Sequence, residues 1–131
     1  MFAEDVKKLT KENTNFRKVL HTGEYNQIVA MNIPVGSDIG EEVHPNTDQI
    51  LFFVDGDGEA ILNGETRHVE EHDVVFVPAG ATHNFKNVGD KDLKLFTVYA
   101  PPVENDTNTY AKFVAGELGV DMNLFKIKDL I

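Results

Sequence analysis

Hydrophobic residues in this chain occur in short β-like runs separated by turn-forming residues. The runs are rich in Val, Ile, Phe and Thr, and Gly, Pro, Asn or Asp stands between most of them. Since consecutive runs start roughly ten residues apart with no helical pattern between them, they predict antiparallel strands of a sandwich or barrel, and not a parallel α/β sheet. The eight predicted strands are 16–20, 27–33, 49–55, 59–63, 66–70, 73–78, 83–87 and 93–100.

One turn between these runs has a specific signature. Asn63 and Gly64 separate two runs, and a type I′ hairpin turn requires a positive φ at both of its central residues. A two-stranded hairpin is therefore expected there. Helical spacing is confined to the chain ends, and within residues 1–13 Val6 and Leu9 lie three apart on one face of a short predicted helix.

A second amphipathic pattern follows Pro101 and Pro102, which end the last predicted strand. Its apolar residues recur with helical spacing and predict a short helix over roughly 107–118. They are Tyr110, Phe113, Val114 and Leu118. The final segment, 123–131, is apolar enough to be buried beneath the barrel or against a partner chain, and the pattern leaves its form open.

The length of 131 residues favours one domain with a single hydrophobic core. The longest uncharged apolar stretch, 50–54, is far shorter than the roughly 20 residues of a transmembrane helix, so no membrane span is expected. Residues 1–13 are charged and lack the apolar region of a secretory signal, which leads us to expect a cytoplasmic protein. The absence of cysteine excludes disulfide scaffolds, zinc fingers, iron–sulfur clusters and thiol nucleophiles.

The formal charge of the chain is −10, from 22 Asp and Glu against 12 Lys and Arg. Such a charge repels the phosphates of nucleic acid and the headgroups of anionic lipids, so neither is expected as a partner. Acidity alone identifies no positively charged partner, and we interpret it as a surface that favours solubility. Any metal site in this chain must use His, carboxylate or amide oxygen.

The first segment with specific chemistry is P-x-G-x-x-H-x-x-x-N, formed by Pro78, Gly80, His83 and Asn87. Pro78 ends an apolar strand and Gly80 permits a tight turn, so that the chain re-enters the sheet at His83. By the two-residue period of a strand, His83, Phe85 and Asn87 point to the same face.

The second segment places Glu42 and His44 two residues apart, with Gln49 at the start of the next strand. The offset of five between His44 and Gln49 would put them on opposite faces of a continuous strand. Both point inward only if residues 45–48 bend or bulge the chain, which Pro45 makes plausible. A less favoured assignment uses the alternation of His44, Asn46 and Asp48.

These two segments resemble the two motifs of the cupin superfamily, small jelly-roll barrels, and in particular small single-domain bacterial cupins with a cupin 2 type conserved barrel. The second motif matches from Pro78 to Asn87, with His72 at its leading glycine position. The first motif, a Gly-rich lead followed by H-x-H, a Glu, six intervening residues and a Gly, is anchored on Gly56. Gln49 then occupies the usual glutamate position, and Glu42 and His44 occupy the H-x-H pair.

The resemblance implies an all-β fold, a cupin double-stranded β-helix (jelly-roll barrel) with short terminal helices. It implies a single cupin domain over 1–131, with a conserved barrel at about 26–100, an N-terminal arm at 1–15, and a C-terminal helix and tail at 103–131. Exposed edge strands and apolar chain ends further lead us to expect a homodimer.

The resemblance also implies a divalent transition metal held by four side chains: Glu42, His44, Gln49 and His83. Three His with one Glu carry a formal charge of −1, and two His with one Glu and one Gln carry the same charge. Nitrogen and oxygen ligands without sulfur suit Fe, Mn, Ni, Co or Zn, and the residue types do not choose among them. An octahedral ion with four protein ligands keeps two positions for a substrate.

The function implied by the resemblance is a metal-dependent enzyme acting on a small oxygen-rich molecule. Dioxygenase, sugar isomerase, decarboxylase and lyase reactions occur in such barrels, and the fold does not choose among them. The alternative is a non-catalytic cupin that binds a small molecule, for example a sugar, at a degenerate metal site. A purely structural or storage role is less favoured.

The other histidines and several phenylalanines are interpreted without reference to a metal. His21, His68 and His72 lie near predicted turns and are expected to be exposed, with His72 a candidate acid or base near the mouth of the barrel. Five phenylalanines are interpreted first as core, some of them lining the barrel cavity. They are Phe52, Phe53, Phe76, Phe85 and Phe96.

Overall fold

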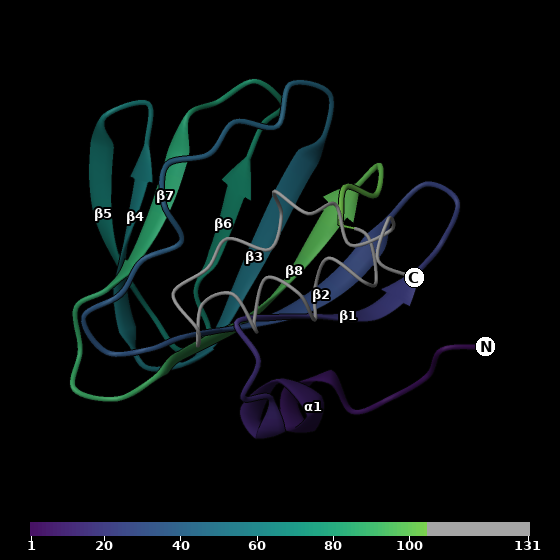
Figure 1. Ribbon diagram of the computed structural model, residues 1–131, viewed down its shortest axis with the longest axis horizontal. Coiled ribbons are helices and arrows are strands. Elements are labelled where there is room, and N and C mark those ends of the chain that lie inside the picture. The colour runs from purple at the N-terminus through teal and green to yellow at the C-terminus, as the bar shows by residue number, and fades with distance from the viewer. Residues whose placement is uncertain (105–131) are drawn as a thin grey trace, which may run out of the picture.

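Two antiparallel β-sheets form the body of the molecule in the computed structural model, which describes residues 1–104 (Figure 1). The larger sheet has five strands in the order β1-β2-β8-β3-β6, and the smaller has three in the order β5-β4-β7. The elements are α1 (Val6–Glu12), β1 (Arg17–Thr22), β2 (Gln27–Ile33), β3 (Asp48–Asp55), β4 (Asp57–Leu62), β5 (Glu65–Glu70), β6 (Val74–Val77), β7 (His83–Asn87) and β8 (Leu93–Ala100).

The predicted all-β architecture is confirmed, since every strand expected from the hydrophobic runs overlaps an observed strand. Neighbours in the sheets are distant in sequence: β8 lies between β2 and β3, with Gln27 and Gln49 both opposite Tyr99. Such crossing connections are those of a jelly roll. They bring the start of β2, the start of β3 and the end of β8 together at one end of the larger sheet.

The N-terminal helix is confirmed as α1, which follows an Asp5 cap whose side chain accepts a hydrogen bond from the Lys8 backbone N–H at 3.0 Å. The helix packs against β8, β3 and β2. The helix expected over 107–118 and the tail over 123–131 lie outside the described residues. Within the described part of the chain, no helix has the length and apolar character needed to cross a membrane.

The Asn63-Gly64 turn has the predicted geometry. Asn63 has φ 47° and Gly64 has φ 86°, and the flanking residues Leu62 and Glu65 pair across the β4–β5 ladder. Positive φ at both central positions is the requirement of a type I′ turn. The predicted hairpin is therefore confirmed.

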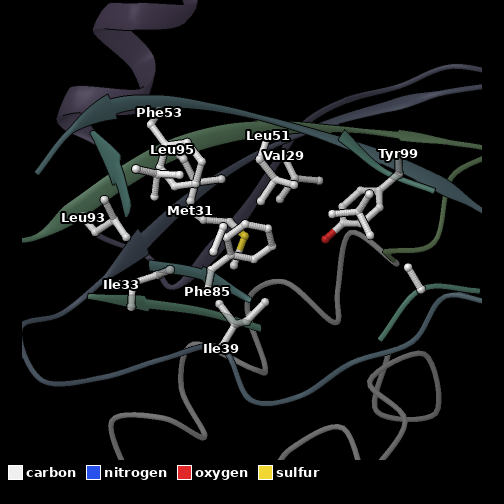
Figure 2. Close-up of a cluster of buried hydrophobic side chains, with 14 residues drawn as sticks. Val29, Met31, Ile33, Ile39, Leu51, Phe53, Phe85, Leu93, Leu95 and Tyr99 are labelled. Carbon is white, nitrogen blue, oxygen red and sulfur yellow. The ribbon is translucent and has the colours of Figure 1, made fainter. Parts of the chain in front are cut away.

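The hydrophobic core lies between the two sheets (Figure 2). Alternate residues of the larger sheet, among them Met31, Leu51 and Leu95, point inward and meet Phe85 of the smaller sheet. Burial of these side chains away from water is the main force that holds the two layers together.

The prediction that five phenylalanines belong to the core is only partly right. Phe53 and Phe85 are buried, but Phe76 is 53% exposed on the outer face of β6. Phe52 and Phe96 stack with ring centroids 4.8 Å apart and are half-buried. The alternation along β3 explains the difference, because successive side chains point to opposite faces and Phe52 and Phe53 cannot both point inward.

Two turn positions require left-handed backbone. At Gly56, where φ is +93°, an added Cβ would lie 2.6 Å from the carbonyl oxygen of Asp92, so only glycine fits. His72 has φ 76°, the conformation that glycine adopts without steric cost. The residue that replaces the motif's leading glycine thus keeps the backbone geometry of a glycine.

Candidate metal centre

Three of the four predicted ligands lie together. Atoms of Glu42, His44 and His83 that can bind a metal all lie within 4.8 Å of one another. Glu42 and His44 precede β3, while His83 begins β7 in the smaller sheet. The two segments are joined by a backbone bridge, in which the Glu42 N–H donates to the His83 carbonyl at 2.8 Å and the His83 N–H donates to the Glu42 carbonyl at 2.9 Å.

The imidazole of His83 is oriented by one hydrogen bond. Its Nδ1 lies 3.0 Å from the carbonyl oxygen of Ala81, which can only accept a hydrogen bond, so Nδ1 carries the proton and donates. In the neutral ring, Nε2 then has a free lone pair. That nitrogen is buried and makes no hydrogen bond within the described residues. This orientation by a backbone carbonyl is typical of histidines that bind metals.

Gln49, the fourth predicted ligand, is the second residue of β3. Its side chain is buried, and Oε1 makes no hydrogen bond within the part of the chain that the structure describes. It lies opposite Tyr99 in the β3–β8 ladder, and the ring of Tyr99 contacts that of His44 with centroids 5.6 Å apart.

The bend expected between His44 and Gln49 is present, because residues 45–46 form a turn and β3 begins only at Asp48. The alternative ligand set with Asn46 and Asp48 gains no support. Both residues are exposed, and Asp48 Oδ1 accepts a hydrogen bond from the backbone N–H of Ala79 at 2.9 Å.

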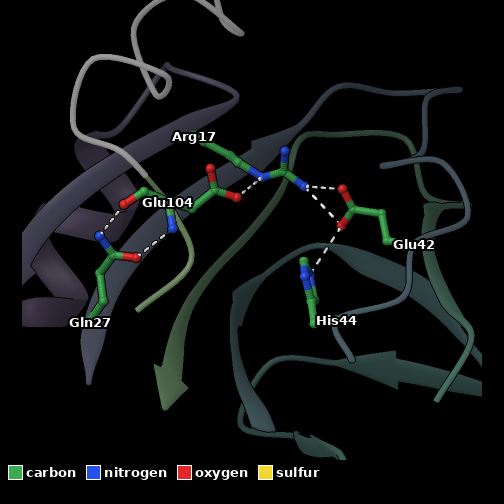
Figure 3. A network of polar contacts seen from close by, with 5 residues as sticks. All are labelled: Arg17, Gln27, Glu42, His44 and Glu104. Carbon is green, nitrogen blue, oxygen red and sulfur yellow. Dashed lines mark hydrogen bonds and ion pairs between the residues drawn. The ribbon is translucent and has the colours of Figure 1, made fainter. Parts of the chain in front are cut away.

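Sequence analysis missed a buried arginine beside the cluster (Figure 3). Arg17 begins β1, and its side chain is only 2% exposed. Its Nη2 donates to both carboxylate oxygens of Glu42, at 3.1 and 3.0 Å. Its Nε faces Glu104 Oε1 at 3.6 Å, and its guanidinium lies 5.2 Å from the ring centroid of Phe16. One cation therefore lies between two carboxylates.

Glu104 is held in place through its main chain (Figure 3). The side-chain amide of Gln27 donates to the Glu104 carbonyl at 2.7 Å and accepts from the Glu104 N–H at 2.9 Å. The same amide also donates to the Thr22 hydroxyl at 2.9 Å. The chain that leaves β8 is thereby fixed next to Arg17.

The electrostatics of these groups follow from burial and from each other. Burial lowers the pKa of His44, with further lowering by His83 and Arg17, while Glu42 acts in the opposite direction. Burial raises the pKa of Tyr99 strongly, so its phenol stays protonated. Burial tends to lower the pKa of Arg17, but Tyr99, Glu42 and Glu104 outweigh it and the guanidinium stays charged.

The donor set is suited to a dication. His44 Nε2, His83 Nε2 and Gln49 Oε1 are buried atoms without a hydrogen-bond partner in the described residues. Buried lone pairs of this kind are costly unless a cation or a donor meets them. Imidazole nitrogen with amide and carboxylate oxygen suits first-row transition metals. The cluster is thus a candidate metal site, and Arg17 contacts the carboxylate of its Glu42.

The other histidines lie elsewhere. His21, His68 and His72 are exposed, as expected. The suggestion that His72 is an acid or base near the mouth of the barrel is wrong. Its backbone N–H donates to the carbonyl of Phe53, which lies on β3 four residues beyond Gln49. In an extended strand, four residues span about 13 Å.

Residue His68 belongs to a second, outer group on the β4–β5 ladder. Its Nε2 lies 3.3 Å from Asp57 Oδ1 and 3.3 Å from Glu70 Oε1. All three side chains are at least half exposed. Water solvates them, so no ion is required to explain their positions.

Comparison with known proteins agrees with this architecture. Residues 29–99 match the family model described as "Cupin domain". The chain belongs to the cupin family. This match spans β2 to β8 and includes His44, Gln49 and His83. The resemblance inferred from the two motifs is therefore confirmed.

Individual cupins similar to this chain include proteins from distant organisms. The uncharacterized protein YrkC of Bacillus subtilis is 38% identical over 77% of the chain, and the uncharacterized protein L612 of Acanthamoeba polyphaga mimivirus is 33% identical over 77%. The chain spans 58% and 66% of the lengths of these two relatives. A crystal structure of a Bacillus halodurans protein is similar at 37% identity and TM-score 0.78, covering 79% of this chain and 83% of that one.

Proposed function

We propose that this cupin is a metal-dependent enzyme that acts on a small oxygen-rich molecule. Glu42, His44, Gln49 and His83 are the proposed ligands of a divalent transition metal, one of Fe, Mn, Ni, Co or Zn. When bound, such an ion supplies Lewis-acid or oxygen-activating chemistry to a coordinated substrate. Oxygenation, isomerisation, decarboxylation and elimination are all compatible with such a site.

The observation that carries the proposal is the buried, unpaired Nε2 of His83 beside two further donor groups. The Nδ1 contact to Ala81 at 3.0 Å directs the free lone pair toward Glu42 and His44. Without a bound ion or hydrogen-bond donor, this buried lone pair of His83 stays unsatisfied, at a cost of about 1–3 kcal/mol. A bound metal removes that cost.

The second candidate is a non-catalytic cupin that binds a small molecule without a tightly held metal. The contact between Arg17 and Glu42 favours it. A guanidinium on both oxygens of the carboxylate neutralises the charge that a dication would use. Gln49, at the usual glutamate position, adds no charge of its own.

The two functions differ in metal content, which elemental analysis of freshly purified full-length protein measures directly. The enzyme predicts close to one transition-metal ion per chain. His44→Ala and His83→Ala are expected to abolish metal retention while the β-type circular dichroism persists. His21→Ala serves as the control, because His21 is exposed on β1 and stacks on Phe2.

Absence of metal in the wild-type protein, together with binding of a small molecule, would favour the second candidate. Metal retained at the wild-type level in both His44→Ala and His83→Ala would show that the assigned ligands are wrong. Loss of metal in His21→Ala alone would assign the metal to a different site.

A homodimer is also part of the proposal. β6 is a terminal strand of the larger sheet, and its Val74 and Phe76 are 57% and 53% exposed. A second copy covers such an edge most simply. Light scattering of the eluting protein tests this, with Phe76→Glu expected to give a monomer. The cytoplasmic location expected from the sequence stays a prediction.

A further inference from the structure

Beside the proposed metal ligands lies a second set of polar groups that the metal does not use. Arg17 Nε and the Tyr99 hydroxyl are buried, and neither makes a hydrogen bond of full geometry within the described residues, although the two groups interact with each other. Both can donate a hydrogen bond, unlike the lone pairs of His44 and His83. Donors of this kind beside a cation site are suited to an anionic oxygen.

A carboxylate already approaches these donors. Glu104 Oε1 lies 3.6 Å from Arg17 Nε, near enough for attraction but too far for a hydrogen bond. Its backbone is held by Gln27, so the carboxylate reaches Arg17 from a fixed main chain. The contact is an ion pair without the geometry of a strong one.

The local formal charge favours an added anion once a metal is bound. Glu42 and Glu104 contribute two negative charges and Arg17 one positive charge, so the three together carry −1. A dication changes this local sum to +1. Displacement of the Glu104 carboxylate by another carboxylate keeps the sum the same, and a dianion brings it to zero.

Solvent reaches this side of the site. The side chains of Glu42, His44 and Glu104 are 20%, 18% and 13% exposed, whereas Arg17 is 2% exposed. The guanidinium therefore lies behind side chains that solvent reaches.

We propose that Arg17, with Tyr99, forms a carboxylate-binding subsite next to the proposed metal centre. The carboxylate of Glu104 competes with the ligand for the Arg17 guanidinium. The ligand class is a small organic acid that places its carboxylate on Arg17 and a second oxygen on the metal. The contact between the ligand and the metal rests on the proposed function, whereas the carboxylate subsite depends only on Arg17, Tyr99 and Glu104. Carboxylate is favoured over other anions because Arg17 already donates to the Glu42 carboxylate and faces that of Glu104.

The test is a titration with glycolate, compared with its neutral analogue glycolamide, monitored by NMR of the full-length protein. The chain has two arginines, so it gives two Nε–H signals, and exposed Arg67 is the internal control for Arg17. Zinc-loaded and metal-free samples are titrated in parallel, with metal content measured on each. Glycolate is expected to shift the Arg17 signal and leave the Arg67 signal unchanged, while glycolamide shifts neither.

Substitutions of Arg17 and Glu104 test the role of each residue in glycolate binding. Arg17→Gln is expected to weaken glycolate binding about tenfold or more, and Arg67→Gln to leave it unchanged. Glu104→Gln is expected to strengthen it about threefold or more, because a neutral amide does not compete for the guanidinium. Should Arg17→Gln fail to fold, Glu104→Gln decides alone.

Unchanged or weaker binding in Glu104→Gln, or equal binding of glycolate and glycolamide, would overturn the subsite. Zinc retention without any glycolate response would overturn it too, while leaving the proposed metal function intact. If no metal is retained, the metal function fails, and the subsite stands only if metal-free Glu104→Gln binds glycolate in preference to glycolamide.

Discussion

Arg17 Nη2 donates hydrogen bonds to both carboxylate oxygens of Glu42, at 3.1 and 3.0 Å, and so joins the first residue of β1 to a proposed metal ligand 25 positions away. The pair crosses from the larger sheet to the segment that bridges to β7. Because the guanidinium is nearly inaccessible to water, its charge depends on this carboxylate and on Glu104.

Removing the Glu42 charge should therefore destabilise the metal-free protein. Glu42→Gln leaves a buried guanidinium with one distant carboxylate, and we expect the free energy of unfolding to fall by about 2 kcal/mol. Urea denaturation of metal-free protein measures this. The control is Glu65→Gln, which breaks the exposed pair with Arg67 and should cost under about 0.5 kcal/mol. Equal effects of the two substitutions would contradict the importance of burial.

Gln49→Glu should increase metal affinity and reduce the stability of the metal-free protein. The new carboxylate adds a negative charge to the proposed ligand set, but without metal it is a buried charge. Thermal melting with and without added metal should show a larger metal-induced stabilisation than in the wild type. Gln27→Glu is the matched control, since that glutamine is equally buried but bonds to the Glu104 main chain. A wild-type metal response in Gln49→Glu would place residue 49 outside the ligand set.

Stability of the metal-free protein should fall as the pH is lowered through the titration of His44. Burial lowers the pKa of His44 in the folded state, so the unfolded chain binds the proton first. Its contribution to stability is therefore full above the ordinary histidine pKa of about 6.5 and declines below it. Urea denaturation at pH 7.5 and 5.5 should show a smaller loss for His44→Gln than for the wild type. An equal loss in both proteins would assign the pH dependence to other groups.

His72→Gly should stabilise the protein. At φ 76° the histidine is in the left-handed region, which costs a non-glycine residue roughly 1–2 kcal/mol, partly offset by the greater freedom of glycine when unfolded. We expect a gain of up to about 1 kcal/mol in the free energy of unfolding. Glu71→Gly, at a neighbouring residue without positive φ, should instead lower stability. Destabilisation by both glycines would mean that the His72 conformation carries no strain.

Asn87 is expected to be a structural residue of the second motif and not a ligand. Its amide donates to the carbonyls of Ile33 and Lys91, both at 2.8 Å, and its Oδ1 accepts from the Gly89 N–H at 2.9 Å. Asn87→Ala removes all three bonds and should cost about 3 kcal/mol, measured by urea denaturation. Asn84→Ala on the same strand should cost under about 1 kcal/mol. Metal content of folded Asn87→Ala should equal that of the wild type.

The strands and most of the candidate site could be predicted because each has a local signature. Alternation located β3 and β7, Asn63-Gly64 located the hairpin, and motif spacing selected His44 and His83. The gathering of Glu42, His44 and His83 agrees with that selection, while their metal binding stays a prediction.

Arg17 escaped prediction for a physical reason. Arginine is rarely buried, so its side chain is expected to face solvent unless a partner is known. The sequence around β1 gives no sign of such a partner. The actual face is decided by carboxylates from residues 42 and 104, which approach only after the chain has folded.

The reciprocal backbone bonds between Glu42 and His83 have an evolutionary consequence. Amides and carbonyls make this connection, so the two corners keep their separation whichever side chains they carry. A histidine can be exchanged for a glutamate at one corner without rebuilding the scaffold. If these residues bind a metal as proposed, interchangeable corners of this kind would let one barrel change its ligand set through a few substitutions.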